Sequence, residues 1–172
     1  FLKTRNPPIE YDWYLQSYLE KRHLQDDFGL VKKYPNRFLE GDITSRKKIE
    51  QYVKLFDKNK RNIVTSDCGL GGAEAYNSPD FDFRDKQMMK IFLGQFVCGL
   101  GVLEKGGNFF MKSYNSFNKF TVSLIYLMSG FFQKVTLLKP MLSKQPDGKE
   151  IYYCLYNFTG ITDDQLSKLL NI

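Results

Sequence analysis

Three charged residues stand at the boundaries of predicted strands. Asp67 and Lys112 each end a predicted strand, and Glu150 immediately precedes one. If these strands are neighbours in one sheet, the three side chains lie near one sheet edge, where two carboxylates and a lysine could orient a hydroxyl group and handle its proton. Each residue also has a structural interpretation: a turn residue for Asp67, an exposed strand end for Lys112 and a surface charge for Glu150.

The segment before Asp67 is a short apolar, β-branched run that contains Ile63 and Val64. Its lack of polar alternation predicts a strand buried on both faces, as in a parallel α/β sheet. Ligands of such sheets bind beyond the carboxyl ends of the strands, so Asp67 would point into the site. The glycine-containing segment 68–80 is predicted to be a loop long enough for binding.

Apolar periodicity predicts alternating helices and strands along most of the chain. Helices are expected at 11–24, 46–56, 82–103, 117–132 and 162–170, and strands at 37–40, 62–67, 108–112, 134–138 and 151–158. This alternation indicates an α/β sheet, and the last two strands, which no helix separates, indicate an antiparallel end.

The composition narrows the class of protein. A chain of 172 residues with 42% hydrophobic residues can form one domain with a substantial core. Its longest apolar run, Phe120 to Phe132, is shorter than the roughly 20 residues of a membrane-spanning helix, so no membrane association is predicted. The formal net charge of +6 favours a polyanionic partner such as RNA. Basic residues such as Lys32, Lys33 and 46–48 also suit an ordinary solvated surface.

The cysteines are scattered in the sequence. Cys68, Cys98 and Cys154 lie far apart, and His23 is the single histidine. This pattern argues against a disulfide framework and against a zinc site, and no metal is predicted. It favours a reducing compartment, for which we expect the cytoplasm, with the nucleus as the alternative.

An ordered set of motifs between residues 36 and 158 resembles one family. The motifs are Gly41-Asp42-Ile43-Thr44, Val64 to Asp67, Gly106 to Lys112, Leu137 to Pro140 and the polar loop Ser143 to Glu150. They resemble FtsJ-like ribose 2′-O-methyltransferases, above all the branch that acts on the first nucleotides of capped mRNA. The resemblance implies a Rossmann-like class I methyltransferase sheet, mostly parallel with an antiparallel C-terminal strand and helices on both faces.

The same resemblance assigns roles to the three charged residues. Asp67, Lys112 and Glu150 match the last three members of a Lys-Asp-Lys-Glu tetrad. Lys112 would assist deprotonation of the ribose 2′-hydroxyl, which Asp67 and Glu150 orient for attack on the methyl group of S-adenosylmethionine. A lysine that accepts a proton must first lose its own, and two nearby carboxylates oppose that loss.

Cofactor and RNA contacts are implied in the same way. Asp42 would bind the adenine amine of S-adenosylmethionine, Ile43 would lie alongside the ring, and Asp67 would stand between cofactor and ribose. The structural alternative for Asp42 is an acid near a helix N-terminus. Ser143 and Lys144 are predicted to contact the RNA backbone.

In the family, a first strand, a Gly-rich cofactor loop and the first tetrad lysine precede the segment that matches Phe1. We therefore expect residues 1–172 to be a single FtsJ-like methyltransferase domain that is incomplete at its N-terminus. The predicted function is methyl transfer from S-adenosylmethionine to an RNA ribose 2′-hydroxyl, near the cap of mRNA. The alternative is a catalytically inactive relative that binds RNA or a nucleotide, and a structural protein is a third hypothesis.

Overall fold

The computed structural model describes residues 11–18, 29–69, 81–114, 119–140 and 150–171. Two units can be distinguished, Phe1–Asp42 and Ile43–Ile172. The first contains β1 (Leu15–Ser17), α1 (Leu30–Lys33), the 3-10 helix η2 (Pro35–Arg37) and β2 (Phe38–Glu40). Strands β1 and β2 pair in parallel, and the backbone amide of Gly41 donates a hydrogen bond to the carbonyl oxygen of Ser17.

The second unit is built on a four-stranded sheet. Its order is β3 (Arg61–Ser66), β4 (Leu103–Tyr114), β6 (Glu150–Phe158) and β5 (Phe132–Leu138). Strand β3 is parallel to β4, whereas β6 is antiparallel to both β4 and β5. Three strands therefore run in one direction and the last strand runs against them, which confirms the predicted sheet with an antiparallel C-terminal strand.

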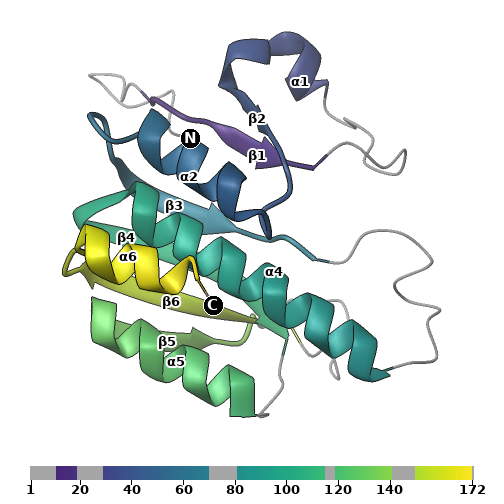
Figure 1. Cartoon of the computed structure of the whole chain (residues 1–172), viewed down its shortest axis with the longest axis vertical. Helices are drawn as coiled ribbons and strands as arrows, with labels where there is room; N and C mark the ends of the chain where they lie inside the picture. The colour runs from purple at the N-terminus through teal and green to yellow at the C-terminus, as the bar shows by residue number, and fades with distance from the viewer. Residues whose placement is uncertain (1–10, 19–28, 70–80, 115–118, 141–149, 172) are drawn as a thin grey trace. The chain divides into compact units, whose positions relative to one another are not determined.

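The described helices of this unit cover one face of the sheet, and two of them connect its strands (Figure 1). The chain passes from β3 to β4 through α4 (Phe81–Val102) and from β4 to β5 through α5 (Lys119–Phe131). Because parallel crossovers are right-handed, two crossovers that move in the same direction across a sheet place their helices on the same face. Helices α2 (Arg46–Leu55) and α6 (Asp163–Leu169) pack against α4.

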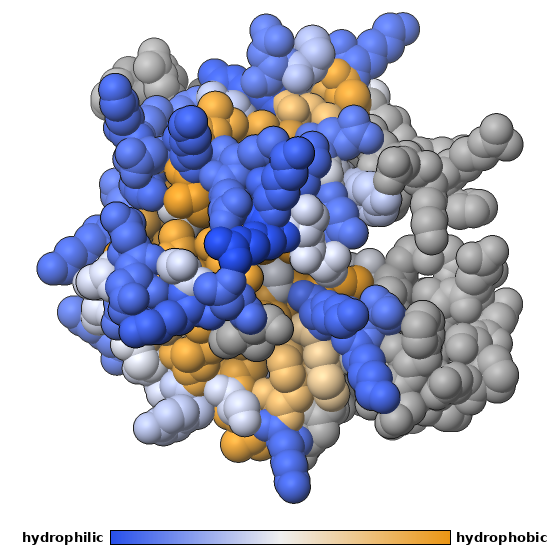
Figure 2. Space-filling model, viewed as in Figure 1, coloured by the Kyte–Doolittle hydropathy of each residue, from blue (hydrophilic) through white to orange (hydrophobic). Residues whose placement is uncertain are grey.

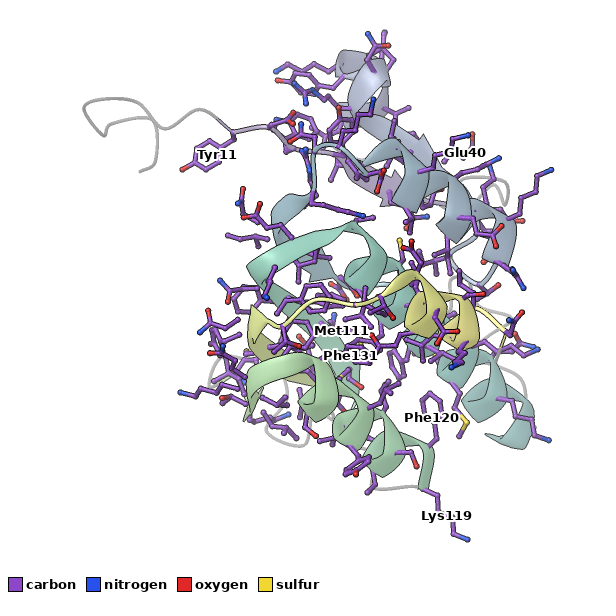
Figure 3. The ribbon with its side chains drawn as sticks, turned by 60° about the vertical axis from the view of Figure 1, so that its left-hand side comes forward. Tyr11, Glu40, Met111, Lys119, Phe120 and Phe131 are labelled. Atoms are coloured by element: carbon purple, nitrogen blue, oxygen red, sulfur yellow. The ribbon has the colours of Figure 1, made fainter. Side chains whose placement is uncertain are left out.

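The core lies between this helical layer and the sheet. Phe109 and Met111 alternate with less buried neighbours along β4 and are fully buried. The Phe109 ring stacks on that of Phe96 in α4, with centroids 6.3 Å apart. Figure 3 shows Met111 and Phe131 in the interior of the unit, whereas Lys119 at the start of α5 points away from it.

Polarity differs between helices on the face shown in Figure 2. Hydrophilic residues dominate over α2, where Arg46 and Lys47 are exposed, and hydrophobic residues gather over α5. On α5, Val122 and Tyr126 expose 55% and 81% of their surface. None of the described helices has the length and apolar character needed to cross a membrane.

Three local predictions were wrong. Residues 15–17 of the expected helix 11–24 form β1, because pairing with β2 overrides local helix preference. Strand β3 is not buried on both faces: it ends the described strand order, and Ile63 is 60% exposed. Residues 104–107, which lie between the expected helix 82–103 and the expected strand 108–112, belong to β4, where the irregular pairing with β3 and the positive φ of 87° at Gly106 indicate a bulge.

Candidate functional site

The structure brings Asp67, Lys112 and Glu150 together. The Nζ atom of Lys112 lies 3.0 Å from Oδ1 of Asp67 and 3.8 Å from Oε2 of Glu150. It also donates a hydrogen bond of 3.4 Å to Oδ2 of Asp67. The lysine therefore stands between two carboxylates that come from segments far from it in the sequence, and the roles of the three residues stay predictions.

Strand register explains why these three side chains lie close together. The parallel pairing of β3 and β4 runs up to Ser66 opposite Met111, so Asp67 and Lys112 follow at the same level. Lys112 is paired with Tyr152 across the antiparallel β4–β6 ladder. Because β6 runs against β4, its first residue, Glu150, lies at the edge where β3 and β4 end.

The site is open to solvent on one side. Side-chain exposure is 20% for Lys112, 66% for Asp67 and 32% for Glu150. Ion pairs with such exposure typically contribute little to folding stability, so stability alone is a poor explanation for this cluster. The exposed oxygens of Asp67 are accessible to a ligand.

Two further residues complete the surroundings of Glu150. The hydroxyl of Tyr152 donates a 2.7 Å hydrogen bond to Oε1 of Glu150, and this bond to the carboxylate raises the pKa of Tyr152. Lys139, directly after β5, donates a 2.9 Å hydrogen bond to the backbone oxygen of Glu150. The sequence contained a signal for Tyr152, because residues two apart on a strand share one face. For Lys139 the signals were its place after a strand and its membership of the motif Leu137 to Pro140.

The residues predicted to bind the cofactor lie in both units. Asp42 is the half-buried last residue of the first unit, and Ile43, 9% exposed, begins the second. The carbonyl of Ile43 lies so close to α4 that a Cβ atom at Gly94 would collide with it. Asp67 offers exposed carboxylate oxygens. The predicted RNA contacts Ser143 and Lys144 lie outside the described residues.

Comparison with protein families gives a match over most of the chain. A family model described as FtsJ-like methyltransferase matches residues 23–158. A solved structure of a Plasmodium falciparum protein described as a ribosomal RNA methyltransferase aligns with a TM-score of 0.53 at 20% identity, covering 72% of this chain and 64% of the other. This similarity supports the mixed α/β fold.

Two curated relatives illustrate the range of similar proteins. The uncharacterized protein L511 of Acanthamoeba polyphaga mimivirus is 31% identical over 93% of this chain and 21% of its own length. The cap-specific mRNA (nucleoside-2′-O-)-methyltransferase 1 of Xenopus laevis is 36% identical over 77% of this chain and 16% of its own length. The chain thus spans only a small part of the curated relatives that it matches.

Proposed function

The chain belongs to the FtsJ-like methyltransferase family, and on that premise we propose that it takes part in methyl transfer from S-adenosylmethionine to the 2′-hydroxyl of an RNA ribose, near the cap of mRNA. The observation that carries the proposal is the position of Lys112 between Asp67 and Glu150 at one sheet edge. The name of the Xenopus laevis relative supports the choice of a capped RNA as the substrate.

The chemistry of the available groups is compatible with a bound nucleoside cofactor. Carboxylate oxygens accept hydrogen bonds from amines and hydroxyl groups, and Asp67 has such oxygens exposed at the end of β3. We propose that Asp67, Asp42 and Ile43 contact S-adenosylmethionine. When bound, this cofactor supplies an electrophilic methyl group.

The protein's own residues would orient and deprotonate the ribose hydroxyl. Asp67 and Glu150 hold the Nζ atom of Lys112 in place, and the hydroxyl of Tyr152 in turn fixes one oxygen of Glu150. A charged Lys112 donates a hydrogen bond to the hydroxyl oxygen, and a neutral Lys112 accepts the hydroxyl proton.

An RNA partner is supported by the charge of the chain, which carries a net +6. If phosphates contact Lys144 and the exposed Arg46 and Lys47, binding weakens steeply as the salt concentration rises. We propose the cytoplasm as the compartment, with the nucleus as the alternative, because the three cysteines are free thiols.

The test compares Lys112→Ala with Lys105→Ala in the full-length protein. Lys105 is an exposed lysine nearer the start of the same strand, so it controls for loss of charge on β4. We expect Lys112→Ala to abolish transfer of labelled methyl groups to capped RNA while RNA affinity is retained, and Lys105→Ala to stay active. A fully active Lys112→Ala protein would contradict the assignment of the site.

A calorimetric titration with S-adenosylmethionine separates the two principal hypotheses. The methyltransferase hypothesis requires a measurable heat of binding at a high protein concentration. If no heat is detected and no methyl group is transferred, the methyltransferase hypothesis fails, and the inactive RNA- or nucleotide-binding relative and the structural protein are the hypotheses that remain.

A further inference from the structure

A buried glutamine on α4 contacts the segment that carries Asp67. Gln95 is 3% exposed and is followed along α4 by the buried residues Phe96 and Val97. A side-chain amide in such a place needs hydrogen-bond partners, because an unpaired buried polar group is costly. The partners of Gln95 therefore show what it is used for.

The amide of Gln95 has four hydrogen bonds. Its Oε1 accepts from the hydroxyl of Ser66 and from the backbone N–H of Cys68, the latter at 2.9 Å. Its Nε2 donates to the carbonyl oxygens of Cys68 and Ile91 at 3.4 Å and 3.3 Å. Three of these bonds reach the residues immediately before and after Asp67.

These bonds begin where the strand ladder stops. The described pairing of β3 with β4 ends at Ser66, so no ladder bond with β4 fixes the backbone at Asp67 and Cys68. Gln95 holds Ser66 by its hydroxyl and Cys68 by both backbone groups. The side chain of Asp67 between them reaches Lys112 at 3.0 Å.

From this arrangement we infer that Gln95 is a positioning residue that fixes the backbone around Asp67 and so aims its carboxylate at Lys112. Among the described residues, the hydrogen bonds of Gln95 reach Ser66, Cys68 and Ile91 and not Lys112 or Glu150, so Gln95 acts through Asp67. The contact network stands by itself, whereas its importance for catalysis rests on the proposed methyl transfer.

The first arm of the test needs no activity. The carboxyl ¹³C resonance of Asp67 is measured in four versions of the full-length protein: unaltered, Lys112→Met, Gln95→Met and the double variant. Methionine has a similar length but cannot replace the amide bonds. We expect Lys112→Met to shift the resonance when Gln95 is present and to shift it by less than about half as much in Gln95→Met.

The second arm uses methyl transfer. We expect Gln95→Met to slow transfer about 10- to 100-fold, since small misplacements of a site residue have effects of that size. In an Asp67→Ala background the same substitution should change the rate by less than about twofold, because the group that it positions is gone. Equal effects of Gln95→Met in both backgrounds would show that Gln95 acts on stability alone.

Two further variants keep the result interpretable. Val97→Ala removes a buried side chain from the same helix that has no hydrogen bond to lose, and it should leave the response of Asp67 to Lys112→Met unchanged. Ser66→Ala removes one bond to Gln95 and should weaken that response in the same direction, so it carries the test if Gln95→Met does not fold.

The outcomes distinguish this inference from the proposed function. If the unaltered protein transfers no methyl group, the proposed function fails, and the Asp67 resonance alone decides about Gln95. An equal response of that resonance to Lys112→Met with and without Gln95 overturns the inference, even in an active enzyme.

Discussion

Gly94→Ala tests how closely α4 packs against the chain that enters α2. A Cβ atom at Gly94 would overlap the carbonyl oxygen of Ile43 and would lie 3.1 Å from its carbonyl carbon and 3.5 Å from Cα of Thr44. All three are backbone atoms, so no side-chain rotation can relieve the overlap. The two segments would have to separate.

The expected cost follows from two opposing terms. Forcing extra carbon into a packed interior costs about 1–3 kcal/mol. Alanine in place of glycine returns about 1 kcal/mol of helix propensity. The difference of the two terms is a net loss of about 0–2 kcal/mol in the free energy of unfolding. Because the obstacle is rigid backbone, we expect the upper half of this range, about 1–2 kcal/mol.

Urea denaturation measures this loss. With an m value of about 2 kcal/mol per molar urea, the midpoint should fall by about 0.5–1 M at unchanged m. The matched control is Gly130→Ala on α5, where nothing lies within 4 Å of the added Cβ atom. It should raise the midpoint by up to about 0.5 M, because only the propensity term acts.

The direction in which Gly94→Ala moves the urea midpoint decides the test. If Gly94→Ala raised the midpoint as Gly130→Ala is expected to do, the close approach of α4 to Ile43 would be refuted. A lower midpoint in both variants would show that helix propensity was misjudged.

Two predictions concern titratable groups. Burial raises the pKa of Cys98 to about 12. A raised pKa means that the folded state favours the neutral thiol, so its contribution to the free energy of unfolding is fully present below the ordinary pKa of about 8.5. This contribution is lost as the pH rises from there toward the pKa of the folded state. Urea midpoints at pH 8 and pH 10.5 should therefore fall less in Cys98→Ala than in the unaltered protein, and equal falls would contradict the prediction. Glu150→Gln should lower the pKa of Tyr152 toward its ordinary value of about 10, because it removes the carboxylate that accepts a hydrogen bond from the Tyr152 hydroxyl. A pH titration of the Tyr152 ring resonance measures this shift, and an unchanged or higher pKa would speak against the hydrogen bond.

Much of the second unit could be predicted from local sequence patterns. Helices α2, α4, α5 and α6 and strands β3, β5 and β6 were expected at nearly their observed positions, whereas β4 begins five residues before the expected strand 108–112. The long α4, for example, repeats apolar residues with helical spacing from Met88 to Leu100, and periodicity of this kind depends only on neighbours along the chain.

The sequence alone also singled out the residues at one sheet edge. Asp67 and Lys112 were recognisable as charges at the ends of apolar strands, and Glu150 as a charge just before one. Strand ends are marked by local composition, so such positions can be identified without knowing which strands are neighbours. Their distances from one another could not be obtained in this way.

Tertiary structure decided which of these positions meet. The antiparallel entry of β6 beside β4 brings Glu150 and Tyr152 to Lys112, and the packing of α4 brings Gln95 to the backbone on both sides of Asp67. Pairing with β2 likewise turned residues 15–17 into a strand against their local pattern. Local sequence patterns indicate the type and approximate bounds of most elements, whereas strand order and helix packing depend on contacts between residues far apart in the chain, and only the folded structure specifies those.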